Sequence, residues 1–248
     1  MSLSVEKVSR SFSGDVAVKD VTFHAEKGEV IGLLGTSGCG KSTVLRAISG
    51  LDTGYEGTIK VNGEQSRSVN KDLGIIFQEA RLMPWLTVLE NVYFGLEGDK
   101  KEKREKAIQL LKQVGLEGFE HYYPKQLSGG MAQRTAIARA LVTEPTTLLL
   151  DEPFSALDAF TKLQLQDMLL DLWNSYRPTM VIVTHDIDEA LYLCDRIVIL
   201  KGQPGEVYDN IKIRKPKPRS KSDIELVKMK ERILKALELG KEPLVREA

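Results

Sequence analysis

The sequence predicts an α/β fold with a mainly parallel sheet, and three observations lead to this prediction. Nearly continuous apolar runs of strand length recur along the chain, at Glu29–Leu34, Thr146–Leu150, Met180–Thr184 and Arg196–Leu200. Long stretches in which apolar residues have helical spacing separate these runs. The first run ends in glycines, which punctuate a strand. Buried strands that alternate with helices build a mainly parallel sheet.

The remaining elements follow in chain order. Two short extended pieces, Leu3–Val8 and Val21–Ala25, precede the first buried run, and Leu73–Phe77 is a further apolar strand segment. The strand signal then disappears between about Glu79 and Val142. Within that interval the charged segment 99–116 has the pattern of an exposed amphipathic helix, with one apolar side formed by Ala107, Leu110, Leu111 and Val114. We therefore expect a helical insertion over about residues 79–142.

The C-terminal part predicts a linker and a helix. Residues 212–221 contain six Lys or Arg, two Pro and no acid, a composition typical of an extended, solvated linker. Ser222 and Glu225 have capping-box spacing, and one helical face follows before Gly240, formed by Leu226, Met229, Ile233, Ala236 and Leu237. We expect a domain at residues 1–211 and an appendage at 212–248, with a regulatory, dimer-stabilising or lipid-surface role left open.

Composition excludes several classes of protein. The 248 residues carry 35 Lys and Arg against 35 Asp and Glu, with 42% hydrophobic and 6% aromatic residues. Zero net charge and few aromatics disfavour a general nucleic-acid binder. The sequence has no apolar run long enough to cross a bilayer and no signal-peptide pattern at its start, so we expect a cytosolic chain. Cys39 and Cys194 give neither a metal-ligand spacing nor a disulfide framework.

The segment GTSGCGKS, residues 35–42, is the most specific local signal. It lies between a buried strand and a helix-like stretch, as the phosphate-binding loop pattern requires. Glycines let successive N–H groups turn toward phosphates, a lysine reaches the β and γ phosphates, and a hydroxyl serves magnesium. The predicted nucleotide contacts are Gly35, Thr36, Ser37, Gly38, Cys39, Gly40, Lys41, Ser42 and Thr43, with Cys39 interpreted as an incidental small residue and Ser42 as the magnesium ligand.

Two adjacent acids follow the apolar run that ends at Leu150. Asp151 and Glu152 lie at the carboxyl end of this strand, where ligands of open α/β sheets bind. We expect Asp151 to hold magnesium through its water shell, and Glu152 to take the proton from a water that attacks the γ phosphate. An acid pair at this place also commonly caps the following helix, but the phosphate loop upstream favours the catalytic interpretation.

A second anion site is predicted at Ser128, Gly129 and Gly130, which come just before an amphipathic helix. One chain then has two phosphate sites for one nucleotide. A head-to-tail pair of chains resolves this excess, with the Ser128 site of one chain closing on the γ phosphate held by the Lys41 loop of the other. A plain N-capped helix explains the serine but does not explain the two glycines.

Taken together, these motifs resemble those of the ATP-binding subunits of ABC transporters, over about Leu3–Leu200. The resemblance implies an ABC ATPase of the P-loop NTPase class, with an N-terminal antiparallel β subdomain. It further implies that Gln78 senses magnesium, water and the membrane partner, that His185 contacts the γ phosphate, and that Phe12 stacks on adenine. The loop that ends at Asp158 is similar to the one that crosses to the opposite subunit.

Residues 81–96, together with the segments around DAFTKLQLQ and THDIDEALYLCDRIVIL, resemble the importer ATPases of the nitrate, sulfonate and taurine group. Met131 in LSGGM also fits that group. This resemblance implies ATP and Mg²⁺ as cofactors, a second ATPase subunit, permease subunits, an extracytoplasmic solute-binding protein, no nucleic acid, and a place on the cytoplasmic face of the membrane. Relatives of this group serve several small solutes, so the solute stays open. An apolar groove for a permease helix is expected near Leu82, Met83, Trp85 and Leu86.

Three alternatives remain at this stage. A soluble DNA-repair or translation ATPase of this class would need a long heptad insertion or a second cassette, and the sequence shows neither. A protein that binds nucleotide without turnover is disfavoured by the intact Glu152 and His185. Export instead of import is disfavoured only because exporters often fuse this domain to membrane helices.

Overall fold

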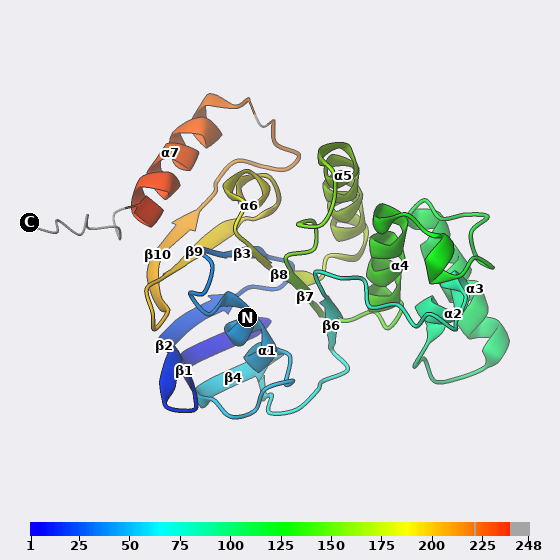
Figure 1. Ribbon diagram of the computed structural model, residues 1–248, viewed down its shortest axis with the longest axis horizontal. Helices are drawn as coiled ribbons and strands as arrows, with labels where there is room; N and C mark the ends of the chain where they lie inside the picture. The colour runs from blue at the N-terminus through cyan, green and yellow to red at the C-terminus, as the bar shows by residue number, and fades with distance from the viewer. Residues whose placement is uncertain (221, 239–248) are drawn as a thin grey trace, which may run out of the picture.

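The buried apolar runs form the centre of a six-stranded sheet with the order β10-β9-β3-β8-β7-β6 (Figure 1). The computed structural model describes residues 1–220 and 222–238. Its central strands are β3 (Val30–Gly35), β6 (Leu73–Ile76), β7 (Thr147–Asp151), β8 (Thr179–Thr184), β9 (Arg196–Lys201) and β10 (Glu206–Lys212). Neighbouring strands are parallel except for β10, which runs antiparallel to β9. The predicted mainly parallel α/β sheet is thus confirmed.

Alternate side chains of the central strands enter two separate cores, which explains why these strands are apolar throughout. Val30 and Leu34 of β3 pack in one core, with the helices on that face, whereas Ile31 and Leu33 pack in the other. A strand that is buried on both faces carries no polar alternation. The helices around the sheet are α1 (Lys41–Ile48), α5 (Ala159–Tyr176) and α6 (Ile187–Leu193).

A second sheet covers the face that holds Ile31 and Leu33. It is antiparallel, with the order β2-β1-β4-β5, and contains β1 (Leu3–Phe12), β2 (Asp15–Ala25), β4 (Glu56–Val61) and β5 (Glu64–Gln65). Its inward residues join Val44 and Leu45 of α1 in the second core. The expected N-terminal antiparallel part is therefore present, and α1 lies between the two sheets.

The helical stretch expected from the loss of strand signal forms one end of the molecule (Figure 1). It contains α2 (Val88–Tyr93), α3 (Lys100–Gln113), the short 3-10 helix η1 (Pro124–Gln126) and α4 (Gly129–Leu141). The predicted apolar side of α3 is buried, at Ala107, Leu110, Leu111 and the capping residue Val114. These residues pack against α2 and α4 in the first core.

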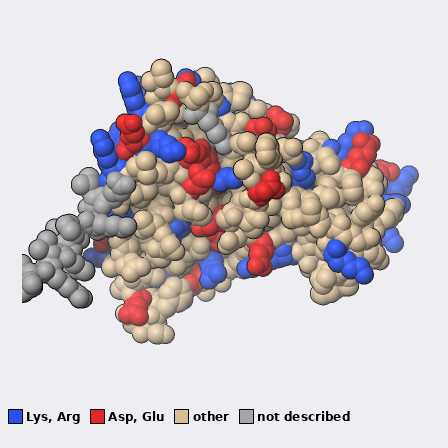
Figure 2. Space-filling model, turned by 45° about the horizontal axis from the view of Figure 1, so that its top comes forward, with Lys and Arg blue, Asp and Glu red and all other residues tan. Residues whose placement is uncertain are grey.

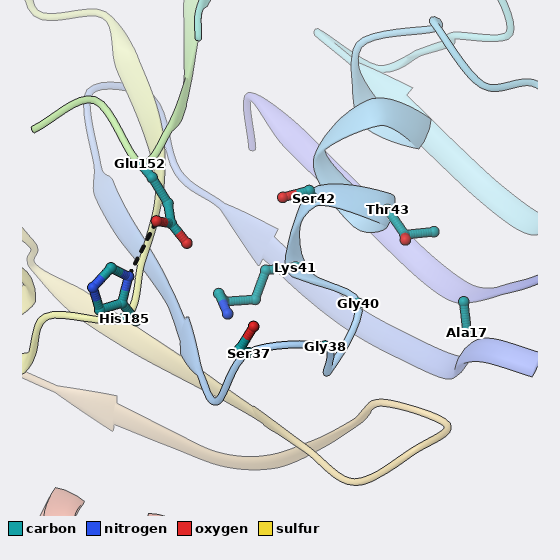
Figure 3. Close-up of a pocket in the computed structure, with 9 residues that line it drawn as sticks. All are labelled: Ala17, Ser37, Gly38, Gly40, Lys41, Ser42, Thr43, Glu152 and His185. Carbon is teal, nitrogen blue, oxygen red and sulfur yellow. Dashed lines mark hydrogen bonds and ion pairs between the residues drawn. The ribbon is translucent and has the colours of Figure 1, made fainter. Parts of the chain in front are cut away.

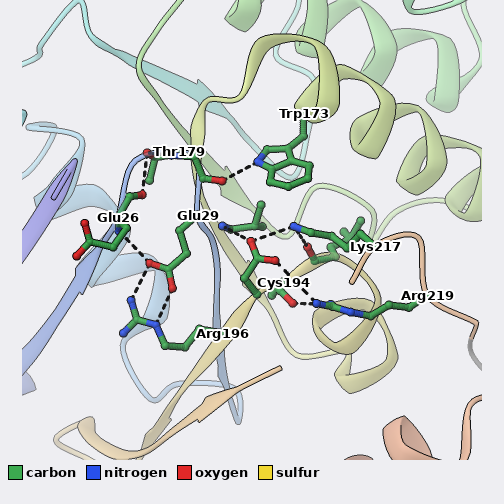
Figure 4. A network of polar contacts seen from close by, with 12 residues as sticks. Glu26, Glu29, Trp173, Thr179, Cys194, Arg196, Lys217 and Arg219 are labelled. Carbon is green, nitrogen blue, oxygen red and sulfur yellow. Dashed lines mark hydrogen bonds and ion pairs between the residues drawn. The ribbon is translucent and has the colours of Figure 1, made fainter. Parts of the chain in front are cut away.

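The basic segment after β10 is extended, but two of its cations are buried, so the expectation of a solvated linker is wrong for them (Figure 4). Lys217 donates to Asp195 Oδ2 at 3.0 Å and lies 3.7 Å from the ring centre of Trp173. Arg219 is 4% exposed and donates to backbone carbonyls of Leu191 and Cys194 at the end of α6. Cations stabilise the carboxyl end of a helix. The segment is therefore docked on the domain.

The last helix, α7 (Ile224–Glu238), has its cap one residue after the predicted position Ser222. Asp223, and not Ser222, accepts the N–H of Glu225, at 2.9 Å, and its carbonyl accepts the N–H of Val227. Asp is as strongly favoured as Ser at the N-cap of a helix, so Asp223 can take the place predicted for Ser222. The predicted apolar face packs against the core, with Leu226, Ile233 and Ala236 buried, whereas Gly240 lies outside the described residues.

Acidic and basic side chains are interspersed on the face drawn in Figure 2, in keeping with the zero net charge. Across residues 1–220 and 222–238, none of the helices combines the length and the apolar character needed to cross a membrane.

Candidate functional site

The loop between β3 and α1 has a shape that only glycine permits at two positions. Gly40 caps α1 with φ +88°, and a Cβ there would lie 2.1 Å from Val18 Cγ1 on β2. Gly38 has φ +82°, also in the left-handed region that L side chains rarely adopt. The glycine spacing noted in the sequence is therefore required by the backbone itself.

The Lys41 side chain is folded into this loop. It is 6% exposed, and its Nζ donates to the carbonyls of Gly35 and Thr36, both at 2.9 Å. These bonds hold the ammonium group in the curve of the loop. Cys39 is 1% exposed, and burial raises the pKa of its thiol more than the nearby Lys41 lowers it. The thiol is thus a packing group, as its interpretation as an incidental residue predicts.

An open cleft of about 490 Å³ lies beside the loop (Figure 3). Figure 3 shows Lys41 between the start of α1 and a facing pair, Glu152 and His185. The lining residues are Ala17, Ser37, Gly38, Gly40, Lys41, Ser42, Thr43, Glu152 and His185. All but Ala17 were predicted from the sequence. Ala17 lies on β2, which touches the loop at Gly40, and no local pattern marks it.

A hydroxyl and a carboxylate meet behind the cleft. Ser42 Oγ, on the first turn of α1, donates to Asp151 Oδ1 at 3.0 Å. Asp151 is the last residue of β7, and α1 packs near β7 and β8. Two predicted magnesium-binding residues, 109 positions apart, are therefore in direct contact.

Glu152 and His185 face each other across the ends of two neighbouring strands. Glu152 follows β7 with φ +45°, and its N–H donates to the carbonyl of Val183 on β8. His185 follows β8, and its Nδ1 lies 3.1 Å from Glu152 Oε2. Parallel strands end at the same edge of a sheet, which is how two segments that are distant in the sequence deliver this pair.

A partly buried ion network behind this pair has no counterpart in the sequence prediction. Lys162 Nζ, on α5, lies 2.6 Å from Asp186 Oδ2 and 3.1 Å from Glu189 Oε2. A cavity of about 110 Å³ is lined by these three residues together with Glu152 and His185. Burial alone would lower the pKa of Lys162, but the two carboxylates outweigh it and the pKa rises. The only sequence signal for this network is the position of two acids, Asp186 and Glu189, shortly after His185.

The other predicted residues lie outside the lining of the cleft. Ser128 Oγ caps α4 by accepting the N–H of Met131 at 3.3 Å, and Asp158 caps α5. Gly130 has a structural reason of its own, because a Cβ there would lie 2.4 Å from Thr161 Cγ2. Gly129 has only Leu157 nearby, at 3.7 Å, so packing explains one glycine and leaves the other unexplained.

Gln78 and Phe12 are exposed side chains in this structure. Gln78 belongs to the segment that connects β6 to the helical end of the molecule. Phe12 is 45% exposed at the end of β1, and the guanidinium of Arg10 lies 4.2 Å from its ring centre.

Comparison with known proteins identifies the family. The sequence profile described as "ABC transporter" matches residues 18–155. The aliphatic sulfonates import ATP-binding protein SsuB of Bacillus cereus (strain ZK / E33L) is 47% identical over 244 residues, which are 97% of each chain. The chain belongs to the family of ABC transporter ATP-binding subunits.

Further relatives and solved structures agree with this ABC assignment. SsuB of Bacillus subtilis (strain 168) is 44% identical over 224 residues, which are 90% of this chain and 88% of that one. A dimeric ATP-binding cassette in a post-hydrolysis state, bound to ADP and Pi, has a TM-score of 0.75 and 34% identity, and it covers 86% of this chain and 100% of its own. The structure of cbiO1 from Clostridium perfringens has a TM-score of 0.79 and 29% identity, over 94% and 93% of the two chains.

Two predictions from the sequence are thereby confirmed. The fold is that of an ABC ATPase, and the chain binds ATP and hydrolyses it in coupling to transport.

Proposed function

We propose that the cleft beside Lys41 is the site at which this subunit binds and hydrolyses MgATP to drive an importer. The observation that carries this proposal is the convergence of four separate segments on one cleft: the phosphate loop, the start of α1, the end of β7 and the end of β8. Residues 35–43 cradle the phosphates, and Phe12 stacks on the adenine. Lys41 exchanges its bonds to the loop carbonyls for bonds to phosphate oxygens.

The donor set at Ser42 and Asp151 fits Mg²⁺. This ion takes oxygen ligands, keeps several waters and is usually held by one or two carboxylates together with substrate phosphates. The contacting Ser42 hydroxyl and Asp151 carboxylate supply two such oxygens. In this proposal phosphate oxygens, water and Gln78 complete the set. When bound, the ion neutralises charge that develops on the phosphates.

Hydrolysis in this proposal depends on the Glu152–His185 pair. Glu152 accepts the proton of a water that attacks the γ phosphate in line. His185 orients the carboxylate through the contact between Nδ1 and Oε2 and reaches the γ phosphate with its other face. Lys162, Asp186 and Glu189 stabilise the start of α6 directly behind the histidine.

Two chains form the working unit. Ser128 and Gly129 lie at the N-terminus of α4, and Gly129 is free of the packing contact that explains Gly130. The helix N-terminus of one chain meets the γ phosphate held by the other chain, and the Asp158 loop crosses between them. Dimeric cassettes among the similar structures support this arrangement. In this proposal residues 1–211 form the ATPase domain, with a helical subdomain at about 79–142, and residues 212–248 form an appendage, of which the described residues 212–220 and 222–238 pack on that domain.

The membrane partner contacts the segment Arg81–Val88. Trp85 in this segment is 72% exposed, and Leu82, Met83 and Leu86 beside it are half-buried. The permease converts closing and opening of the ATPase pair into alternating access at the cytoplasmic face of the membrane. Because the SsuB relatives are named as aliphatic sulfonates import proteins, a small sulfonate delivered by an extracytoplasmic binding protein is the proposed solute.

The variant Glu152→Gln tests the site and the dimer together. It keeps the size and hydrogen bonding of the side chain but cannot accept the proton, so ATP binds and is not hydrolysed. We expect phosphate release to fall by about 10²- to 10⁴-fold, and sedimentation with MgATP to show a stable dimer. A folded variant that hydrolyses at the wild-type rate would contradict the role of Glu152. A wild-type chain that binds ATP without releasing phosphate would favour a nucleotide-binding protein without turnover.

Reconstitution with the permease and binding protein tests the solute and the direction. Uptake of an alkanesulfonate into vesicles, with taurine and nitrate as competitors, distinguishes the members of the group. Cysteines placed between Arg81 and Val88 are expected to crosslink to a cytoplasmic permease helix, and Gln78→Ala to reduce uptake more than ATP binding. Unchanged uptake and no crosslink would refute the proposed membrane contact.

A further inference from the structure

Two side chains of α4 hold the backbone on both sides of Gln78. On the C-terminal side, Arg139 donates to the carbonyl of Ala80 at 2.7 Å and to the carbonyl of Arg81 at 2.9 Å. On the N-terminal side, Gln133 is 3% exposed and its Nε2 donates to the carbonyl of Phe77 at 3.1 Å. The same helix therefore fixes the residues before and after Gln78.

The segment between these anchor points is itself closed. The Arg81 guanidinium lies 4.2 Å from the ring centre of Phe77, so the two ends of the five-residue stretch contact each other. Arg81 has φ +44°, in the left-handed region, which costs energy for a residue with a side chain and persists where the surroundings fix it. The two bonds from Arg139 flank this residue and supply that constraint.

The next part of the chain is tied to the same helical end. Asn91 of α2 is fully buried and donates to the carbonyls of Met83, Leu86 and Thr87, and it accepts the N–H of Met83. Residues 77–87 are thus anchored by side chains of α2 and α4, although the segment begins at the end of β6 in the central sheet.

We propose that Arg139 and Gln133 are positioning residues, which make the segment around Gln78 move as one body with α4. The inference rests on the proposed function, in which the Ser128 end of α4 closes on the γ phosphate of the opposite chain and Gln78 reaches the nucleotide of its own chain. A displacement of α4 on dimer closure is then carried through these three hydrogen bonds to Gln78. Neither residue touches ATP.

The chain contains a matched control for this proposal. Arg134 lies on the same helix, is half-buried like Arg139, and donates to the backbone carbonyl of Val114 at the end of α3. Burial lowers the pKa of both guanidinium groups. The same guanidinium lies 3.6 Å from Met168 Sδ on α5. Arg134→Ala therefore removes a carbonyl bond inside the helical subdomain and one contact with α5, and it leaves the Gln78 segment untouched.

The test measures ATPase kinetics and the position of the segment in the same proteins. Because Cys39 and Cys194 are buried, a fluorescent thiol probe reacts selectively at Glu79→Cys in the exposed part of the segment. We expect MgATP to change the probe signal in this background and in Arg134→Ala, and to leave it unchanged in Arg139→Ala and Gln133→Met. The expected kcat is reduced about 10- to 100-fold in the last two, as misplaced groups commonly cost, whereas KM for ATP stays within about twofold.

The outcomes separate the inference from the function it rests on. Equal effects of Arg139→Ala and Arg134→Ala on kcat and on the probe would show that both residues serve only the fold, and would overturn the proposal. Arg139→Lys, which can reach one of the two carbonyls, is expected to recover part of both signals. If Arg139→Ala fails to fold, Gln133→Met decides by the same criteria. Wild-type hydrolysis in a folded Glu152→Gln protein without the probe would instead refute the proposed site and leave the anchoring of the Gln78 segment untouched.

Discussion

Replacing Lys41 by alanine separates the two contributions that this side chain makes. The phosphate-loop pattern alone gives Lys41 no part in the stability of the fold, but its ammonium group donates to the carbonyls of Gly35 and Thr36 at 2.9 Å. Hydrogen bonds to charged groups contribute about 1.5–3 kcal/mol each. Because the cleft is open, water replaces the ammonium at both carbonyls, and we expect a net loss of about 2 kcal/mol without nucleotide.

The second contribution appears only with nucleotide. A ligand at a concentration of about 100 times its Kd stabilises a protein by about 2.7 kcal/mol, which is a rise in Tm of roughly 5–11 °C for a chain of this size. Lys41→Ala is expected to lower Tm by roughly 4–8 °C without ATP and to abolish the rise with MgATP. Thermal unfolding of wild type and variant, each with and without MgATP, measures both effects.

The exposed Lys27 provides the control, because Lys27→Ala removes the same charge from a surface turn. It should leave Tm and the ATP-dependent rise unchanged. An undiminished ATP-dependent rise in a folded Lys41→Ala protein would refute the assignment of this loop to the phosphates. An unchanged Tm without ATP would refute the structural role of the two carbonyl bonds.

Two further predictions concern the Glu29–Arg196 pair and the start of α4. Burial raises the pKa of Glu29, but hydrogen bonds from Arg196 outweigh it and hold the pKa below its ordinary value of 4.5. The ion pair therefore stabilises the fold at pH values above 4.5, and this stabilisation is lost as the pH falls through the lowered pKa of Glu29. Glu29→Gln should lower the free energy of unfolding by about 3 kcal/mol near neutral pH and by progressively less in acid. Denaturant unfolding at several pH values measures this difference. Gly130→Ala should lower the free energy of unfolding by about 1–3 kcal/mol because the added Cβ meets Thr161 Cγ2. Adding Thr161→Ser, which removes that methyl group, should restore most of the lost stability in the same assay. Gly129→Ala should leave the stability nearly unchanged.

Each of these predictions has a clear contrary result. A stability difference between wild type and Glu29→Gln that stays constant from neutral pH to strongly acidic pH would show that the ion pair does not carry the effect. A Gly130→Ala protein that is as stable as wild type would mean that α4 and α5 move apart without cost. The presence of a glycine at position 130 would then have to be explained by ligand binding and not by packing.

The sequence predicted the buried strands well because burial on both faces leaves a continuous apolar run. The predicted run at Thr146–Leu150 and the observed β7 differ by one residue at each end. By contrast, β10 was missed, since four of its seven residues are exposed, only Ile211 is buried, and no apolar run marks the strand. Its last residue, Lys212, was assigned instead to the basic linker.

Side-chain environments that depend on distant segments could not be predicted in the same way. Lys217 and Arg219 have the composition of a solvated linker, and only the fold brings Trp173 and the end of α6 to them. Conversely, a shared place for Ser42 and Asp151 at magnesium, and for Glu152 and His185 at the γ phosphate, was predicted, because each residue belongs to a motif whose place on the sheet is fixed. The direct contacts within the two pairs were not predicted. Lys162, Asp186 and Glu189 lie in segments that carry the family resemblance, but no local pattern shows that these three side chains meet, so the network was not predicted.

The strand order has a consequence for how this chain acquires its activity during synthesis. The strand that carries the phosphate loop, β3, is made early, yet its partners in the sheet are β8 and β9, with Val30 paired to Met180 and Ile31 to Arg196. Pairings so distant in sequence form late and slowly. A nascent chain that stops before β8 lacks both parallel partners of β3 and also His185, which follows β8. ATP therefore stabilises the finished subunit and gives no such help to a truncated one.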